Sequence, residues 1–410
     1  MSAPFSLVMT GQSLIQHDIR NSSDPGFAQI GRLLKQADIA FTNFENTILG
    51  SHGGWPMKGS YFGCAQPVVL DALKDIGFNA LSLANNHAFD LGPPGILTTL
   101  IEVAMRDFLH AGIGVDRDKA AQAGVMSIAS RNIALVAMDA GPGPATMYAD
   151  NAGDDRPARP GVNGLKVSRT FEVEEAIFDM LATIQTTFQS SGLERANYAQ
   201  PHDPPQLDPE EALDFFGTIF RRARANQRKI LVDRQSAVTQ LEVIEDAVAK
   251  GQFVIAYLHH HHWEPDWQEV PDWVRSFAHE CIDAGARTFV SHGAPVLQPI
   301  EIYKGAPIFF GLGNFIFHTE KNAGEWDPPE VWRSVVATCL FDNDDELRSI
   351  ELLPIVLDHS LEKDCREDRV PTVATGQTAL RIITDLTQRS RRFGTAIVSE
   401  DGIGKIYLSR

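Results

Sequence analysis

Four consecutive histidines, His259 to His262, directly follow the apolar stretch 253–258. If that stretch is a β-strand, alternate side chains point to opposite faces, so His259 and His261 share one face and His260 and His262 share the other. Imidazole nitrogen is a ligand for zinc, manganese and iron, so one pair could bind a metal while the other packs or meets solvent. Polar loop histidines without a metal are the alternative.

Other side chains with metal-binding atoms also follow short apolar stretches. Glu45, Asn86, His87 and His292 each come at or just after the end of a stretch that is typical of a strand. Helical patterns separate most of these stretches, and strands that alternate with helices predict a largely parallel sheet. Because ligands of such sheets bind beyond the carboxyl ends of the strands, we expect one convergent cluster of oxygen and nitrogen ligands.

Three further polar residues are candidates for the same site. Asp90 follows His87 by three residues and could accept a hydrogen bond that fixes the histidine tautomer, or could simply be a carboxylate near a helix N-terminus. Gln12 and Asn314 also follow apolar stretches and could line a substrate pocket. For Asn314, an ordinary turn asparagine is the alternative.

Recurring apolar and amphipathic patterns define the elements that must position these residues. We predict strands at 5–9, 39–42, 79–83, 133–138, 253–258 and 288–290, and expect 335–341 and 350–355 to complete a second sheet. We predict helices at 27–36, 67–76, 94–110, 273–284 and 373–391. The fold class is therefore α/β, with strands that carry the candidate site at their carboxyl ends.

The alternation of apolar stretches and helical patterns is interrupted between residues 141 and 251. Amphipathic stretches at 172–187, 209–228 and 237–250 predict a mostly helical insertion, which is either a lid or a structural cover. We therefore predict a core from residues 1–140 and 252–360, the insertion or lid at 141–251, and a C-terminal helix and strand at 361–410 that pack on the core.

The segment 156–165 of this insertion is rich in proline and glycine and contains Arg156 and Arg159. Arginine captures carboxylate or phosphate through two parallel hydrogen bonds, so both residues are candidate substrate-binding groups. Ordinary arginines in a solvated loop are the alternative.

Composition and charge exclude several classes of function. The 410 residues include 36 Lys and Arg against 53 Asp and Glu, a formal net charge of −17. That balance argues against binding to nucleic acid or to an anionic membrane. The N-terminus does not resemble a signal peptide, and four scattered cysteines without a C-x-x-C pair are typical of reduced thiols, so we expect a cytoplasmic protein. A homo-oligomer is compatible with the sequence.

Several segments, in this order, resemble the bacterial capsule-synthesis proteins of the CapA/PgsA type, which are linked with poly-γ-glutamate. The resemblance covers about residues 5–140 and 252–355. The segments that carry it are Asn43-Phe44-Glu45, Ala84-Asn85-Asn86-His87 with Asp90 and Gly92, Asp283 to Ala286, His292-Gly293, Gln298 to Glu301, and Leu312 to Phe315. It implies a fold similar to the calcineurin-like metallophosphoesterases, an αββα sandwich.

The resemblance also implies roles for individual residues. Glu45 matches the position of a bridging carboxylate, and Asn86 matches a metal-binding asparagine. His87 matches the histidine that stabilises developing charge or protonates the leaving group. One of His259 and His261 matches a further metal ligand, as does His292. The implied cofactor is a divalent transition metal (Zn, Mn or Fe), with one or two ions.

Two positions depart from the family pattern. Gln12 stands where the family has an aspartate, and Pro295 stands near the place of a second late histidine. The simplest inference is that one metal position survives and the other is missing or rebuilt. His17, Asp18 and the second member of the His259/His261 pair are the candidates for rebuilding it.

These observations predict a metal-dependent hydrolase that cleaves a phosphoester or an amide bond through a metal-activated water. The net charge of −17 should repel a long anionic polymer, so we expect a small anionic substrate. The alternative is a non-catalytic accessory protein in capsule or poly-γ-glutamate biosynthesis.

Overall fold

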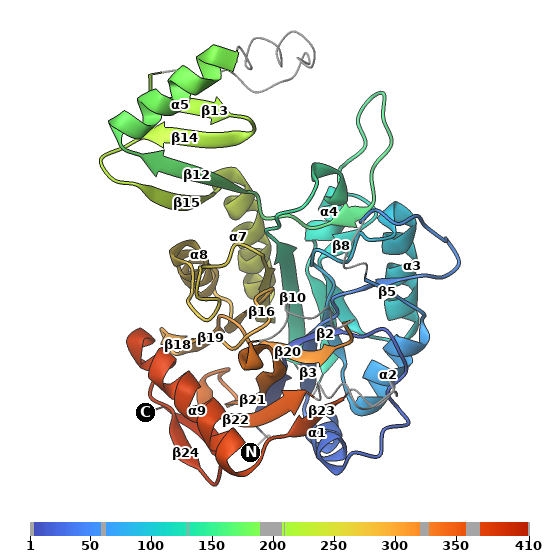
Figure 1. Ribbon diagram of the computed structural model, residues 1–410. Coiled ribbons are helices and arrows are strands. Elements are labelled where there is room, and N and C mark those ends of the chain that lie inside the picture. The colour runs from blue at the N-terminus through green and yellow to red at the C-terminus, as the bar shows by residue number, and fades with distance from the viewer. Residues whose placement is uncertain are drawn as a thin grey trace. The chain divides into compact units, whose positions relative to one another are not determined.

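Short apolar strands alternate with helices along the first 111 residues and form half of a large sheet in the computed structural model (Figure 1). The structure describes residues 4–58, 63–128, 131–188, 207–208, 210–319, 328–357 and 370–408. The chain divides into two compact units, which we call unit 1 (Met1–Leu165 with Ser236–Arg410) and unit 2 (Lys166–Gln235).

The parallel half of the first sheet follows the chain order. Its strands are β1 (Phe5–Met9), β3 (Ile39–Asn43), β6 (Ala80–Ser82) and β7 (Leu109–Ala111). The helices between them are α1 (Pro25–Gln36), α2 (Val68–Ile76) and α3 (Gly92–Met105). Helix α1 begins where the sequence favours it, because the Asp24 side chain accepts a hydrogen bond from the Phe27 amide and Pro25 occupies the first turn.

The antiparallel half of the first sheet comes from the C-terminal part of the chain. Its strands are β21 (Arg333–Phe341), β22 (Leu347–Leu357), β23 (Pro371–Val373), β24 (Val398–Glu400) and β25 (Ile403–Tyr407). Strand β21 pairs antiparallel with β1, so the expectation that 335–341 and 350–355 complete the second sheet is wrong. Apolar patterning marks a strand as buried but carries no information about which distant strand it pairs with.

The second sheet of unit 1 has parallel strands at its centre and antiparallel strands at both edges. In sheet order they are β18 (Ile300–Tyr303), β19 (Ala306–Phe309), β17 (Thr288–His292), β16 (Phe253–His259), β10 (Arg131–Asp139) and β9 (Gly124–Ile128). Helix α7 (Arg234–Ala249) leads into β16, and α8 (Asp272–Asp283) packs on β17. Helix α9 (Gly376–Ser390) packs on β22 and β25.

Short paired strands complete the described part of unit 1. They are β2 (Gln12–Leu14) with β20 (Asn314–Phe317), β4 (Thr47–Ile48) with β5 (Cys64–Ala65), and β8 (Ile113–Gly114) with β11 (Gly161–Val162), next to the short helix α4 (Arg117–Ala121). Among the described residues, no helix is both long and apolar enough to cross a membrane. Cys281 and Cys339 are buried free thiols, and Cys365 lies outside the described residues.

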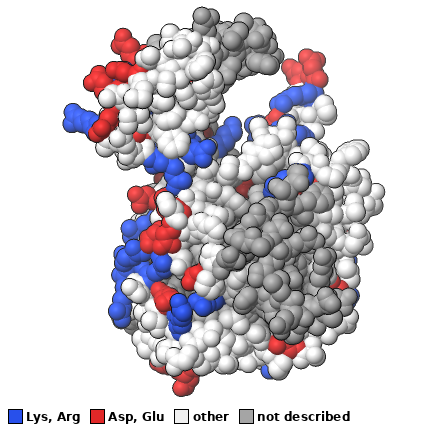
Figure 2. All heavy atoms as spheres, viewed as in Figure 1, with Lys and Arg blue, Asp and Glu red and all other residues white. Residues whose placement is uncertain are grey.

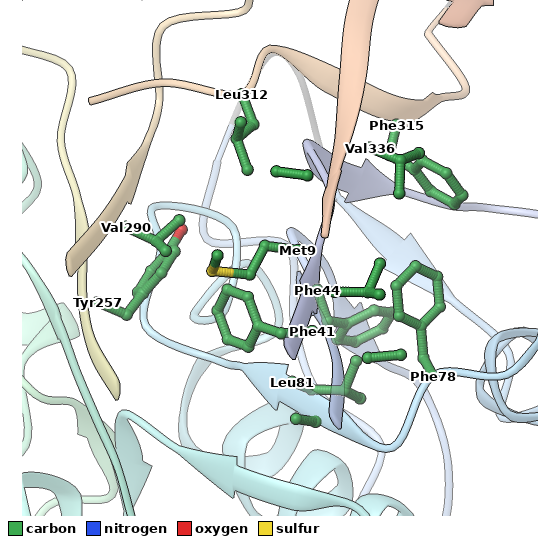
Figure 3. Packing of buried hydrophobic residues seen from close by; sticks show 14 of the residues in the cluster. Met9, Phe41, Phe44, Phe78, Leu81, Tyr257, Val290, Leu312, Phe315 and Val336 are labelled. Atoms are coloured by element: carbon green, nitrogen blue, oxygen red, sulfur yellow. The ribbon is translucent and has the colours of Figure 1, made fainter. Parts of the chain in front are cut away.

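The two sheets of unit 1 pack face to face through aromatic side chains. Phe253 lies 5.0 Å from Phe5 and 4.9 Å from Phe341, measured between ring centroids. Nearer the carboxyl ends of the strands, Phe41 of β3 lies 5.5 Å from Tyr257 of β16, in the cluster shown in Figure 3. The predicted α/β sandwich is therefore confirmed, and this shared core fixes the strand ends that carry the candidate site.

The described residues of unit 2 form a small sheet and a helix. The elements are β12 (Val167–Val173), α5 (Glu175–Phe188), β13 (Ala212–Phe215), β14 (Thr218–Arg222) and β15 (Gln227–Val232), and the strand order is β13-β14-β12-β15. The helices expected at 172–187 and 237–250 are present as α5 and α7, but the prediction of a helix at 209–228 is wrong. Phe216 and Gly217 both have positive φ and close a two-residue hairpin there, a turn that glycine makes accessible.

The boundaries of the insertion also differ from those expected. Residues 141–165 and 236–251 belong to unit 1, so the separate compact unit is shorter than the predicted 141–251. The helix predicted at 94–110 corresponds to α3, which already ends at Met105. Residues 109 and 110 belong to strand β7 instead. A lid function for unit 2 stays a prediction.

Replacing Phe253 by alanine should lower the free energy of unfolding of unit 1 by about 3–5 kcal/mol, because the side chain is 1% exposed and fills the contact between the sheets. Urea unfolding followed by tryptophan fluorescence measures this, since all six tryptophans lie in the sequence of unit 1. The control is Met105→Ala on α3, where the side chain is 73% exposed and the change should stay within about 0.5 kcal/mol. Equal unfolding midpoints for the two variants would contradict this account of the core.

Candidate metal centre

Three parallel strands of the second sheet end side by side in polar residues. In the strand register Asp139 pairs with His259, and His259 pairs with His292. Register partners on neighbouring parallel strands face the same side of a sheet. Tyr257 lies two residues before His259 and packs against Phe41, so this row of side chains faces the first sheet.

The first sheet contributes Glu45 and Asn86 from loops that follow β3 and β6. The Asn85 side chain fixes these loops together, because its Nδ2 donates to the Phe44 carbonyl at 2.8 Å and to Asn43 Oδ1 at 3.1 Å. The Glu45 amide donates to the Ser13 carbonyl at 3.1 Å. Polar residues that bind backbone groups thus hold the two loops against the ends of the strands.

Glu45, His259 and His261 form what we call the ligand cluster. Each offers one potential ligand atom, and these atoms all lie within 4.8 Å of one another. His259 Nε2 also lies 3.1 Å from Asn86 Oδ1 and 3.9 Å from Glu45 Oε1. The sequence left open which of His259 and His261 faces the site, and the structure brings both to it.

Burial controls the ionisation of the ligand cluster. It raises the pKa of Glu45 to about 8, with Asp139 and Asp90 adding to the increase and Lys58 opposing it. Burial and the neighbouring imidazoles hold the pKa of His259 well below its usual range, and burial lowers the pKa of His261 to about 3. The histidines are therefore neutral at pH 7, which is the form that binds metals.

Unpartnered polar atoms also favour a cation at this site. Among the described residues, His261 Nε2 and both ring nitrogens of His292 are buried without a hydrogen-bond partner. Buried polar atoms in proteins normally have partners, so such atoms need an explanation. Imidazole, carboxylate and amide groups together form a donor set that fits a divalent transition metal.

His292 lies next to the ligand cluster rather than within it. It is the register neighbour of His259, and burial lowers its pKa to about 3. The turn that follows His292 is held by Gln12, a predicted substrate-binding residue. Gln12 Oε1 accepts a hydrogen bond from the Gly293 amide at 3.1 Å. Asn314 likewise binds backbone, since its Nδ2 donates to the Val331 carbonyl at 3.1 Å. A role for either amide in substrate binding stays a prediction.

His87 and Asp90 form a buried pair beside the cluster. His87 Nδ1 lies 2.7 Å from Asp90 Oδ2, which also accepts a hydrogen bond from the Gly63 amide at 2.6 Å. This geometry fits the expected role of Asp90 in fixing the tautomer of His87. Burial lowers the pKa of His87, and the hydrogen bond to Asp90 opposes that change.

The sequence interpretation missed Lys58 and Asp139. Lys58 Nζ donates to the Asn86 carbonyl at 3.2 Å and lies 3.9 Å from Asp90 Oδ1, so a positive charge stands beside the candidate site. Asp139 ends the apolar stretch 133–138, which is the signal that identified the other candidates and could have identified this one. No comparable signal pointed to Lys58, because it lies in a loop.

His17 and Asp18, the candidates for rebuilding a second metal position, have other partners, and that rebuilding stays a prediction. Asp18 forms an ion pair with Arg20 at 2.6 Å, and His17 stacks on His318 with ring centroids 4.6 Å apart. Among the described residues, neither belongs to the group of potential metal ligands. Asp18 lies next to a guanidinium that neutralises it, which is the physical reason why it is a poor ligand here.

The arginines of segment 156–165 have local partners. Arg156 forms an ion pair with Asp150 at 2.7 Å, and Arg159 donates to the Tyr148 carbonyl from both Nε and Nη2. These contacts fix the loop that carries Tyr148. Binding of a substrate by Arg156 or Arg159 stays a prediction.

The fold and the site define the class: an α/β sandwich with carboxylate, amide and imidazole groups converging at the carboxyl ends of its strands. The family described as bacterial capsule synthesis protein PGA_cap matches residues 6–319, and the chain belongs to this family.

The chain is also similar to individual proteins. The uncharacterized protein y4sH of Sinorhizobium fredii is 30% identical, over 98% of this chain and 93% of its own. The PGA biosynthesis protein CapA of Bacillus subtilis is 24% identical, over 76% of this chain and 61% of its own. Among solved structures, the NAD nucleotidase of Haemophilus influenzae gives a TM-score of 0.37 at 10% identity, over 93% of this chain and 56% of that one.

Adding Zn²⁺ or Mn²⁺ to chelator-treated protein should raise the melting temperature, because an ion that binds only the folded state stabilises it, by about 2.7 kcal/mol at 100 times its Kd. The variant His261→Ala should lose most of this increase, since it removes one member of the ligand cluster. Differential scanning fluorimetry with elemental analysis measures both effects. The control is His52→Ala, an exposed histidine. The assignment is wrong if wild type and His261→Ala respond equally to the ion.

Proposed function

We propose that this protein is a metal-dependent hydrolase that cleaves a phosphoester or an amide bond in a small anionic substrate. The observation that carries the proposal is the ligand cluster, because a carboxylate and two neutral imidazoles within 4.8 Å of one another form a donor set that suits a divalent cation. Glu45, Asn86, His259 and His261 would hold the ion, with His292 beside them.

A bound divalent transition metal would supply an activated water and polarise the bond to be cleaved. The protein supplies the other parts. His87 is held by Asp90 in one tautomer and acts as an acid toward the leaving group or stabilises its charge. Lys58 places a positive charge near the same groups, which favours an anionic substrate.

The size of the substrate follows from the charge of the chain. With a net charge of −17, the surface should repel a long anionic polymer. Figure 2 shows basic side chains beside acidic ones along the edge of unit 1 near α8 and α9. At the end of α9, Arg389 and Arg392 form ion pairs with Glu269 at 3.2 and 2.6 Å. These arginines are neutralised locally, so they offer little attraction for a polyanion.

The second candidate function is a non-catalytic accessory role in capsule or poly-γ-glutamate biosynthesis. The names of the relatives favour it, since a Mycobacterium tuberculosis relative is called a probable polyglutamine synthesis accessory protein. Gln12 and Pro295 favour it as well, because both replace residues that could have bound a second ion. The two candidates differ in whether the purified protein turns over a substrate.

A panel of phosphomonoesters, phosphodiesters and γ-glutamyl amides should contain a compound that the metal-loaded protein hydrolyses. For that compound, His87→Asn should lower kcat by about 10²–10⁴, because it removes the proton-transfer group while leaving the ligand cluster intact. Metal content of the variant, measured by elemental analysis, should equal that of wild type.

His52→Ala is again the matched control and should keep full activity. Hydrolysis that His87→Asn leaves unchanged would contradict the role of His87. A metal-loaded protein that hydrolyses none of the three compound classes would favour the accessory role.

A further inference from the structure

Asp139 is a buried carboxylate at the edge of the candidate metal centre. It is the last residue of β10, its exposed fraction is 0%, and it is the register partner of His259 on β16. Its side chain therefore lies on the same sheet face as a member of the ligand cluster.

The two oxygens of Asp139 have different environments. Oδ2 accepts a hydrogen bond from the Tyr148 hydroxyl at 3.0 Å and another from the Gly141 amide at 3.0 Å. Oδ1 is buried and, among the described residues, has no hydrogen-bond partner. A carboxylate oxygen in such a place loses its hydration without compensation, unless a cation lies nearby.

The segment 139–141 also fixes the backbone of the histidine run. The Ala140 amide donates to the His259 carbonyl at 2.8 Å, and the His261 amide donates to the Gly141 carbonyl at 2.7 Å. Because Asp139 accepts a hydrogen bond from the Gly141 amide, it holds the residue whose carbonyl accepts from the His261 amide. The carboxylate is thus linked by hydrogen bonds to one of the proposed ligands.

The charge of Asp139 acts on the same site. It contributes to the raised pKa of Glu45, and burial raises the pKa of Asp139 itself to about 7. These two carboxylates repel each other when both are ionised, and Lys58 opposes this effect on both. A divalent cation held by the ligand cluster would favour the ionised form of both carboxylates.

We propose that Asp139 is a positioning residue of the metal centre, which holds the Gly141–His261 contact and supplies a second negative charge that strengthens binding of a divalent cation. It lies outside the group whose ligand atoms are within 4.8 Å of one another, so it acts through His261 and through its charge. The inference rests on the metal centre of the proposed function.

The variant Asp139→Asn separates the charge from the hydrogen bonds. Asparagine has nearly the same shape, and its oxygen can still accept from Tyr148 and Gly141. In isothermal titration of the chelator-treated protein with Zn²⁺ or Mn²⁺, the Kd of the variant should rise about 10–100-fold, as expected for a residue that supports metal ligands. The metal-free variant should melt at the wild-type temperature or above it, because a buried charge next to Glu45 has been removed.

Two further variants complete the experiment. Tyr148→Phe keeps the charge and removes one hydrogen bond to Oδ2, so its Kd should rise by less than that of Asp139→Asn. Asp150→Asn makes the same chemical change at an ion pair of the same loop and should leave the Kd unchanged.

The outcomes separate the inference from the proposed function. A wild-type protein that binds neither ion overturns both. A wild-type protein that binds an ion with the same Kd as Asp139→Asn overturns the inference alone. A lower melting temperature of metal-free Asp139→Asn with an unchanged Kd would show that Asp139 has only a structural role.

Discussion

The rest of the site depends on one electrostatic constraint: carboxylates and imidazoles are buried together at the junction of two sheets. Removing a carboxylate from water costs several kcal/mol unless a cation or hydrogen bonds replace the water. Glu45 and Asp139 both have pKa values raised by burial, to about 8 and about 7, and the neighbouring histidines are held neutral. An arrangement that is unfavourable for the empty protein becomes favourable once a divalent cation balances the charge.

Packing and hydrogen bonds elsewhere in unit 1 offset the unfavourable free energy of burying these carboxylates. Aromatic packing between Phe5, Phe253 and Phe341 joins the sheets, and the strand ends are fixed in register by the backbone ladder. Amide side chains then hold the loops. Asn85 joins the loops after β3 and β6, and Gln12 binds the turn after His292. These contacts hold the groups of the ligand cluster in place, which would lower the cost of binding a cation.

Gln12 illustrates how the chain departs from its family without losing the site. A glutamine cannot replace an aspartate as an anionic ligand, but its oxygen accepts a hydrogen bond from the Gly293 amide and fixes the turn next to His292. The ligand cluster formed by Glu45, His259 and His261 does not include this position. Within the described residues, both His259 and His261 belong to the cluster, and the single surviving metal position expected from the sequence stays a prediction.

Much of the fold and of the site could be predicted from the sequence, because the relevant signals are local. Apolar stretches followed by polar residues placed β1, β3, β6 and β16 and selected Glu45, Asn86, His259 and His292 as strand-end residues. The sequence could not show that β21 pairs with β1, that residues 212–222 form a hairpin, or that Asp18 is neutralised by Arg20. Strand pairing and ion pairing join residues that local patterns do not connect. Only the tertiary structure brought both His259 and His261 to Glu45 and placed Asp139 beside them, since convergence depends on the register of strands far apart in the chain.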